Sequence, residues 1–234
     1  AFGRLNIERF HAQRLHIGRK CSTTAAVSHA FTKPAKHAVF LEIGAMSQED
    51  AMPDKNGNIP MVNDATYNIA PSSTQLFSYV KDLGIIDQKI PLSDSGYRKI
   101  ISNNYELFID VGNIGPDYQP AHAHSDTFNF ELINEGKPII VDRGISTYEK
   151  NSKREEERST NSHNTVEINS QNQSQVWGGF RVARRAKIIN LKENDKCISA
   201  THDGYKRKGF MHNRVFEWSD YYIKIKDFFV IIKK

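Results

Sequence analysis

The stretch "FNFELINEGKPIIVDRG", residues 128–144, is the most informative part of the chain for its fold. Two short runs rich in Phe, Ile, Leu and Val lie on either side of the turn cluster "NEGK". Runs of this kind, separated by turn residues, are typical of antiparallel strands. We interpret "KPIIVDRG" as a buried strand that ends at Asp142, where a carboxylate costs less to bury if it meets a cation.

The same rhythm continues on both sides of this stretch. It predicts a mainly β fold, with an antiparallel β-sandwich-like domain over residues 91–234. The last run reaches the final residue without a stop signal, so we expect the sheet to be truncated there. The other strand-like runs are "YRKIISNNYELFIDVG", "NTVEINSQ", "FRVARRAKIINLKEN", "CISATHDGY", "HNRVFEWSD" and "YYIKIKDFFVIIKK".

Residues 1–90 have a different character and are predicted to be helical or irregular, with a domain boundary near residue 90. Their clearest element is a short helix over residues 72–86, where apolar residues recur at helical spacing. Ser72 or Ser73 can cap its start, and Gly84 suits its C-terminal end. The region 53–60, "PDKNGNIP", is predicted to be a loop.

Composition and charge exclude several classes of protein. The 234 residues are 38% hydrophobic, which is enough for a sizeable core. The net charge of +5 comes from residues 1–40, which carry seven Lys or Arg and one acid (+6), so the remaining 194 residues sum to −1. This uneven charge gives no reason to expect nucleic-acid binding. Two distant cysteines form no metal or disulfide framework. No stretch is long and apolar enough for a membrane span, and no signal peptide is visible.

The polar pattern His-x-His-x-Asp, at His122, His124 and Asp126, raises the question of a metal site. If residues 122–130 are extended, these three side chains project from one face. With Asp142 and with His163, which precedes another strand, they offer a His/His/Asp set suited to zinc with one open position. Two alternatives stay open: ordinary surface histidines, and a Ser-His-Asp hydrolase with Ser125 or Ser159 as its nucleophile.

Three longer stretches resemble the C-terminal β domain of the heparinase II/III-like polysaccharide lyases. They share with it a His-x-His-x-Asp pattern, a strand ending in Val-Asp-x-Gly, a following Tyr, an Arg-Ser motif before His-Asn-Thr-Val, and a later Trp-Gly-x-Phe. Upstream, residues 56–85 resemble the last helical hairpin of that family's α/α-toroid domain. The three stretches are "AHAHSDTFNFELINEGKPIIVDRGISTYE", "REEERSTNSHNTVEINSQNQSQVWGGFRVARRAK" and "HDGYKRKGFMHNRVF".

The resemblance implies roles for particular residues. One zinc ion would be held by His124, Asp142 and His163, next to an active-site histidine at His122. Tyr148 corresponds to a tyrosine that some members place at the substrate. Arg158 is the arginine of the Arg-Ser motif and can clamp a sugar carboxylate, although an ion pair with a neighbouring glutamate is an equally good explanation.

The implied reaction is β-elimination on an anionic polysaccharide that contains uronic acid, in the periplasm or cell envelope. The family's principal catalytic residues lie on toroid helices, and we find no matching motif in residues 1–90. The chain is therefore interpreted as a lyase fragment, and whether it is an enzyme by itself stays open. The alternatives are a non-catalytic, metal-stabilised β domain that binds carbohydrate or serves as a scaffold, and a zinc hydrolase.

Overall fold

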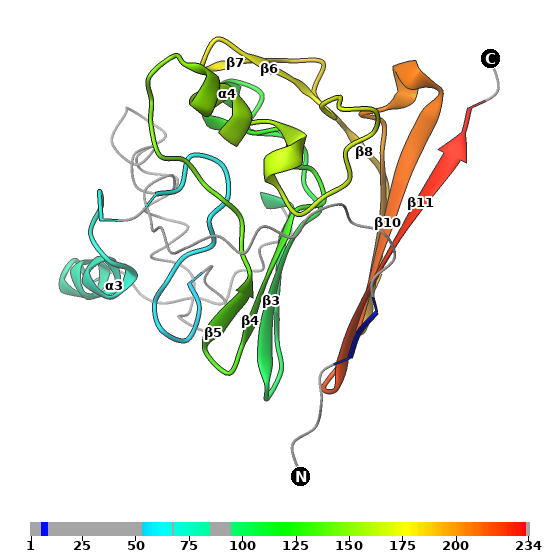
Figure 1. Cartoon of the computed structure of the whole chain (residues 1–234). Coiled ribbons are helices and arrows are strands. Elements are labelled where there is room, and N and C mark those ends of the chain that lie inside the picture. The colour runs from blue at the N-terminus through cyan, green and yellow to red at the C-terminus, as the bar shows by residue number, and fades with distance from the viewer. Residues whose placement is uncertain (1–5, 9–52, 67, 85–94, 233–234) are drawn as a thin grey trace.

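Two β-sheets face each other in the computed structural model, which describes residues 6–8, 53–66, 68–84 and 95–232 (Figure 1). The larger sheet has five strands in the order β1-β11-β10-β9-β8, and all its pairings are antiparallel except β1 with β11. The predicted β-sandwich-like architecture is thereby confirmed. The strands are β1 (Asn6–Glu8), β8 (Ile188–Asn194), β9 (Cys197–His202), β10 (Phe210–Ser219) and β11 (Tyr222–Ile231).

The smaller sheet is a four-stranded antiparallel meander in the order β2-β3-β4-β5. Short turns join β2 to β3 and β4 to β5, as the sequence rhythm predicts, whereas residues 111–129 lie between β3 and β4. Its last strand is not buried as predicted, because Lys137, Pro138 and Ile139 are exposed at the sheet edge, where a proline is tolerated. The strands are β2 (Tyr97–Ile101), β3 (Tyr105–Asp110), β4 (Phe130–Asn134) and β5 (Lys137–Ile140).

The core lies between the two sheets and is centred on β3. Leu107 and Ile109 on β3 pack with Ile198 on β9 and Phe216 on β10, and all four are nearly inaccessible to solvent. Each such side chain contributes about 1.5–3 kcal/mol by its burial. The opposite face of β3 is buried as well, because residues 53–66 cover it. The chain that precedes the β domain is therefore packed onto the smaller sheet.

Helix α3 (Ser73–Asp82) confirms the predicted helix within residues 72–86. Ser72 and Gln75 form a capping box at its start, and Gly84 follows its end with φ of 70°. At one end of the sandwich lie helix α4 (Ser152–Glu157) and the hairpin of β6 (Gln175–Trp177) and β7 (Arg181–Ala183) (Figure 1). None of the helices in the described residues is long and apolar enough to cross a membrane.

Three predicted strands are wrong in detail. Residues 122–130 are not extended, because His122 ends the 3₁₀ helix η3 (Pro120–His122) and Phe128 has φ of 70°. "NTVEINSQ" forms no strand, because the Asn164 side chain donates to the carbonyls of Phe130 and Val141 and thereby caps two neighbouring strands. "FRVARRAKIINLKEN" is divided between β7 and β8 at Arg184, whose φ is 46°.

A chain of hydrogen bonds crosses the interior of the larger sheet. Gly204 N–H donates to His202 Nδ1 (3.0 Å), so His202 Nε2 carries the proton that it donates to His212 Nδ1 (2.9 Å). His212 Nε2 then donates to Asp227 Oδ1 (2.6 Å), and Arg214 binds both oxygens of Asp227 at 2.7 and 2.8 Å. Burial lowers the pKa of both histidines, so both are held neutral.

Some sequence predictions lie outside the described residues. These are the basic segment in residues 1–40, apart from β1, the cysteine at position 21 and the boundary near residue 90. The division into residues 1–90 and 91–234 therefore stays a prediction.

Candidate active site

Asp64 is the centre of the most densely connected polar cluster in the described residues. Its carboxylate is fully buried, and both of its oxygens contact the Arg154 guanidinium, with Oδ2 at 2.9 Å from Nη2. His122 Nδ1 lies 2.5 Å from Oδ2, and His124 Nε2 lies 2.9 Å from Oδ1. Burial alone would raise the pKa of Asp64, but hydrogen bonds from these three side chains outweigh it and hold the pKa well below its usual range. Asp64 is therefore ionised, and both imidazoles donate to it.

The position of Asp64 follows from how its segment docks on the smaller sheet. Glu131 on β4 accepts hydrogen bonds from the backbone N–H groups of Met61 (2.8 Å) and Asp142 (2.9 Å). Ile145 N–H donates to Ala65 O (3.0 Å). Burial raises the pKa of Glu131 to about 8. These backbone contacts hold the segment on both sides of Asp64 and orient its carboxylate toward α4.

Helix α4 supplies the cation. Asn151 caps the helix by accepting from Arg154 N–H (2.9 Å), and the Arg154 side chain is fully buried. Its guanidinium lies 5.2 Å from the Tyr148 ring centroid and 5.1 Å from that of Phe180, while Nε donates to Gly179 O (3.0 Å). Arg154 is therefore fixed by rings and hydrogen bonds, and it fixes Asp64 in turn.

His122 is the member of this cluster that approaches solvent. Its side chain is 28% exposed, whereas those of Asp64 and His124 are fully buried. The Tyr148 and Phe180 rings each lie 6.0 Å from its ring, edge to face. Tyr148 is itself partly exposed, and burial together with the charge of Asp64 raises its pKa to about 12. The structure thus brings His122 and Tyr148 together at a surface lined by aromatic rings.

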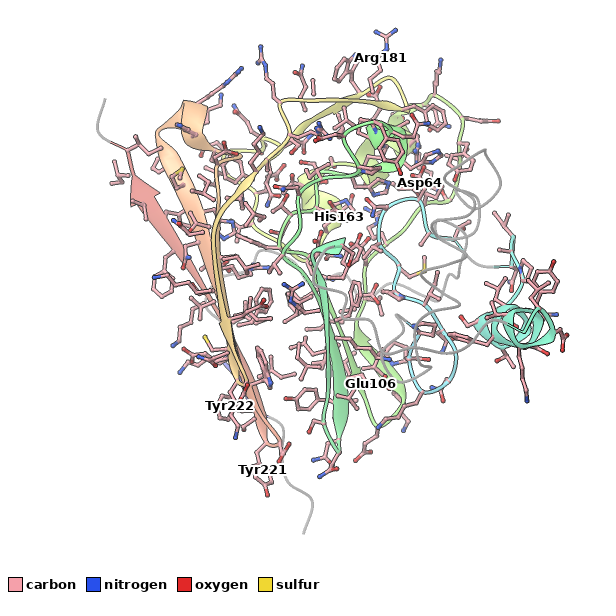
Figure 2. All side chains as sticks on the ribbon, turned by 180° about the vertical axis from the view of Figure 1, so that it is seen from behind. Asp64, Glu106, His163, Arg181, Tyr221 and Tyr222 are labelled. Atoms are coloured by element: carbon pink, nitrogen blue, oxygen red, sulfur yellow. The ribbon has the colours of Figure 1, made fainter. Side chains whose placement is uncertain are left out.

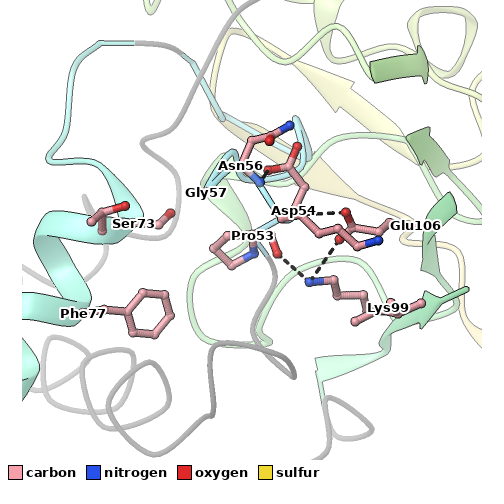
Figure 3. Close-up of a pocket in the computed structure, with 11 residues that line it drawn as sticks. Pro53, Asp54, Asn56, Gly57, Ser73, Phe77, Lys99 and Glu106 are labelled. Carbon is pink, nitrogen blue, oxygen red and sulfur yellow. Dashed lines mark hydrogen bonds and ion pairs between the residues drawn. The ribbon is translucent and has the colours of Figure 1, made fainter. Parts of the chain in front are cut away.

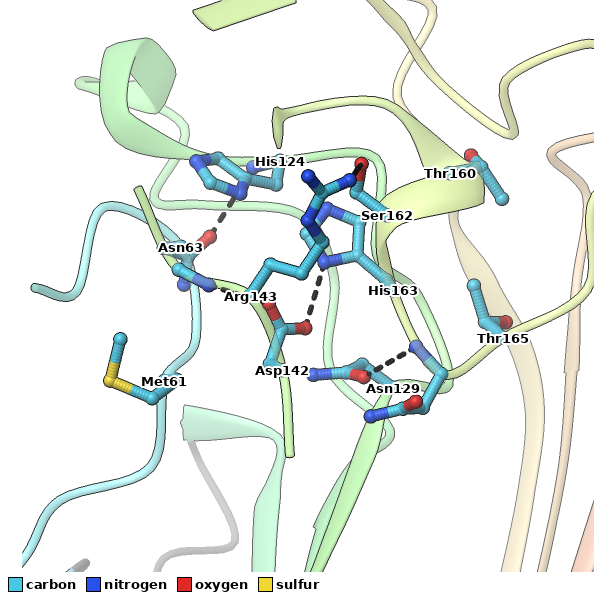
Figure 4. A network of polar contacts seen from close by, with 12 residues as sticks. Met61, Asn63, His124, Asn129, Asp142, Arg143, Thr160, Ser162, His163 and Thr165 are labelled. Carbon is cyan, nitrogen blue, oxygen red and sulfur yellow. Dashed lines mark hydrogen bonds and ion pairs between the residues drawn. The ribbon is translucent and has the colours of Figure 1, made fainter. Parts of the chain in front are cut away.

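A second imidazole group lies deeper. His163 Nδ1 is 2.7 Å from Asp142 Oδ2, and the His163 and His124 rings are 5.2 Å apart (Figure 4). His124 Nδ1 and His163 Nε2 are buried, and neither has a hydrogen-bond partner in the part of the chain that the structure describes. Burial lowers the pKa of His124, whereas Asp142 outweighs burial and raises that of His163. Asp126 is buried close to both rings, and burial raises its pKa.

The predicted metal residues are therefore neighbours, but they do not form a complete site. Among the described residues, no group of three His, Cys, Asp or Glu side chains has the arrangement of a metal site. Asp142 is engaged elsewhere, since Oδ1 accepts from Gly144 N–H (3.0 Å) and Oδ2 faces His163. The two unpartnered ring nitrogens still fit a metal ion, because an imidazole whose other nitrogen contacts a carboxylate is a common metal ligand.

Arg158 and the two candidate serines lie elsewhere. Arg158 is 1% exposed, and its Nη2 donates to Ala123 O (2.8 Å) and Ala121 O (3.4 Å). This placement favours a role in holding the backbone around His122 over direct contact with a substrate. The hydroxyl of Ser125 bonds to Thr160 and Ser174, and that of Ser159 bonds to Glu156 and Asn161. Among the described residues, neither serine has the histidine partner that a Ser-His-Asp hydrolase requires.

The sequence analysis assigned no role to three residues of the cluster, Asp64, Arg154 and Phe180, although Phe180 is the last residue of the Trp-Gly-x-Phe motif. Asp64 and Arg154 are 90 positions apart and belong to no shared motif. The only local signal is the N-cap Asn151, which predicts where α4 begins but not what Arg154 contacts.

A cavity of about 590 Å³ lies apart from this cluster, between α3 and the outer face of β2 and β3 (Figure 3). Lys99 and Glu106, two of its charged residues, contact each other and the backbone. Lys99 Nζ donates to Pro53 O (2.5 Å) and lies 3.6 Å from Glu106 Oε2, while Lys55 N–H donates to Glu106 Oε1 (3.1 Å). These contacts hold the preceding segment on the sheet, which is a structural role. We therefore place the candidate active site at Asp64 and His122 and not at this cavity.

Comparison with known proteins identifies a matching family and similar solved structures. Residues 88–230 match the family described as heparinase II/III-like, C-terminal. The structure resembles that of the heparan sulfate lyase HepC from Pedobacter heparinus, with a TM-score of 0.54 and 17% identity, over 84% of this chain and 32% of that one. A heparinase III, the BT4657 gene product, superimposes with a TM-score of 0.47 and 16% identity, over 86% of this chain and 33% of that one. The chain thus spans about a third of the length of these solved proteins. No curated protein sequence matches it.

Proposed function

Because the chain belongs to the heparinase II/III-like family, whose C-terminal domain matches residues 88–230, we propose that it is part of a polysaccharide lyase. The proposed substrate is an anionic polysaccharide that contains uronic acid, and the proposed reaction is β-elimination. The observation that carries this proposal is the 2.5 Å contact between Asp64 and His122, next to the partly exposed Tyr148 ring.

Elimination requires two proton transfers. A base takes the proton from C5 of the uronate, the C4–O4 bond breaks as the C4=C5 double bond forms, and an acid protonates the departing O4. Asp64 holds the proton of His122 on Nδ1, which leaves Nε2 as the ring's proton acceptor. His122 therefore suits the base. With a pKa of about 12, Tyr148 keeps its proton at neutral pH and suits the acid.

We also propose that His124 and His163 bind one zinc ion through their unpartnered ring nitrogens, while Asp142, the third predicted ligand, holds the His163 ring through its other nitrogen. The support is the pair of buried ring nitrogens without partners, on rings 5.2 Å apart, beside the Asp142 carboxylate. Zinc would supply a fixed positive charge that holds the His124 segment, and hence His122, in place. This ion has a structural role in the proposal and takes no part in either proton transfer.

The reaction is tested by incubating the 234-residue chain with heparan sulfate, chondroitin sulfate, hyaluronan and alginate. Elimination creates an unsaturated uronate that absorbs in the ultraviolet, whereas a zinc hydrolase creates reducing ends without that absorbance. We expect His122→Ala to lower the rate by about 10²–10⁴-fold. Tyr221 is exposed at the other end of the sandwich, and Tyr221→Ala should leave the rate unchanged. Ultraviolet product that forms equally fast with His122→Ala would contradict the assignment.

One observation favours a second candidate function. The chain spans 32% of the solved HepC lyase, so it can be a β domain that binds carbohydrate without cleaving it. Binding of an anionic polysaccharide that is saturable but yields neither product would support this alternative. In both cases the polymeric substrate suggests the periplasm or cell envelope as the location, and cell fractionation tests that expectation.

A further inference from the structure

The β6–β7 hairpin carries an aromatic and a cationic side chain next to each other. Trp177 pairs with Arg181 across the hairpin, so both side chains project from the same face. Both are exposed, with Trp177 at 38%. Gly178 and Gly179 form the turn, with φ of 57° and 78°, a backbone conformation that favours glycine.

The hairpin is held in place by its other face and by its tip. Val182 packs against the cluster of Ile114, Ala123 and Ala186. At the tip, Gly179 O accepts from Arg154 Nε (3.0 Å), and Gly178 N–H donates to Glu155 (3.2 Å). The exposed pair therefore stands on a rigid support.

The same turn connects this pair to the candidate active site. Phe180 lies between Trp177 and Arg181 in the chain, and its ring faces His122 at 6.0 Å and Tyr148 at 5.8 Å. Figure 2 shows Arg181 at the same end of the molecule as Asp64, with Tyr221 at the opposite end. A polymer bound at His122 can therefore continue across the hairpin.

The chemistry of the pair suits an acidic sugar. A flat indole can stack on the apolar face of a pyranose ring, and a guanidinium fork binds a carboxylate or sulfate with two hydrogen bonds. No carboxylate within the described residues forms an ion pair with Arg181, whereas Arg185, two residues beyond β7, is paired with Asp117 at 2.6 Å. Arg181 is thus available to an anion from outside.

We propose that Trp177 and Arg181 form a subsite that binds an acidic sugar residue of the polysaccharide, adjacent to the sugar at His122. This inference rests on the proposed function, because it assigns the subsite to the same polymer. The subsite contributes affinity and takes no part in proton transfer.

The test compares the affinity of the full chain and its variants for size-defined heparan sulfate and alginate oligosaccharides, by titration calorimetry. We expect Trp177→Leu, which keeps an apolar side chain but removes the flat ring, to raise Kd about tenfold. Arg181→Gln should raise Kd by a similar factor at low salt. Its effect should shrink at high salt, where charge is screened, while that of Trp177→Leu persists.

Matched controls separate this subsite from general effects. Tyr221→Ala removes an exposed aromatic residue at the other end of the sandwich, and Lys192→Gln removes an exposed cation on β8; neither should change Kd. Unchanged melting temperatures show that the variants fold. If the wild type binds and both hairpin variants bind equally well, the subsite is wrong and the proposed function stands. If the wild type binds no acidic oligosaccharide, both are overturned.

Discussion

Replacing Asp64 by Asn tests the electrostatic centre of the candidate site. The substitution preserves the shape of the side chain and removes its charge. Arg154 is fully buried, and its Nη groups have no other hydrogen-bond acceptor among the described residues. Its charge would therefore remain in the interior without compensation.

The expected cost is about 3–5 kcal/mol in the free energy of unfolding, the usual result of removing one partner of a buried ion pair. For a chain of this size, that loss lowers the melting temperature by roughly 6–20 °C, at about 2–4 °C per kcal/mol. Chemical denaturation followed by circular dichroism measures the free energy, and a thermal scan measures the melting temperature.

Asp117→Asn is the matched control. Asp117 also pairs with an arginine, Arg185, at 2.6 Å, but its side chain is 96% exposed. We expect little change in stability, because exposed ion pairs contribute little. The double variant Asp64→Asn, Arg154→Met should recover part of the loss, since it removes the buried charge as well. The reasoning is refuted if Asp64→Asn costs no more than Asp117→Asn.

Three further outcomes are expected. The free energy of unfolding should fall as the pH drops below 6.5, the ordinary pKa of histidine, because the unfolded chain then binds protons that buried His202 and His212 do not. Denaturation at a series of pH values measures this dependence, and the plot of unfolding free energy against pH should be flatter for His212→Gln. Zinc added after chelation should raise the melting temperature of the wild type but not that of His163→Ala. An equal rise in both proteins would contradict the metal site, and so would metal analysis that finds no zinc in the purified protein. Gly144→Ala should cost more stability than Gly84→Ala. Both glycines have positive φ, but a Cβ at Gly144 would lie 2.3 Å from Ala65 O, whereas Gly84 faces open space. Equal losses in urea denaturation would rule out that close contact.

Part of the site is visible in the sequence because its signals are local. Asp142 lies two residues beyond the end of β5, and His163 directly follows the 3₁₀ helix η4 (Thr160–Ser162). The structure brings the Asp142 carboxylate and the His163 ring to 2.7 Å, whereas the motif predicts that both bind one metal ion. The roles proposed for His122, Tyr148 and the metal residues stay predictions that the experiments above will test.

Other features have no local signal. The spacing of His122 and His124 suggests an extended strand, yet both imidazoles reach Asp64 from a 3₁₀ turn and an irregular segment. A side-chain period identifies a face only where the backbone is regular. The segment is irregular here because its backbone is tied to side chains distant in sequence, such as Arg158, which donates to Ala123 O.

Hydrophobic alternation, turn residues and a capping box act between neighbours in the chain, so they predict most of the antiparallel strands and the helix after Ser72. The family resemblance rests instead on the motifs around His122, Asp142 and His163. The meeting of Asp64 with Arg154 depends on how a covering segment packs against a sheet and a short helix. The interaction energy of this buried pair depends on two residues 90 positions apart, and no pattern along the chain encodes it. The Asp64–Arg154 pair forms only when the layers pack together, and this packing also fixes the tautomer of His122.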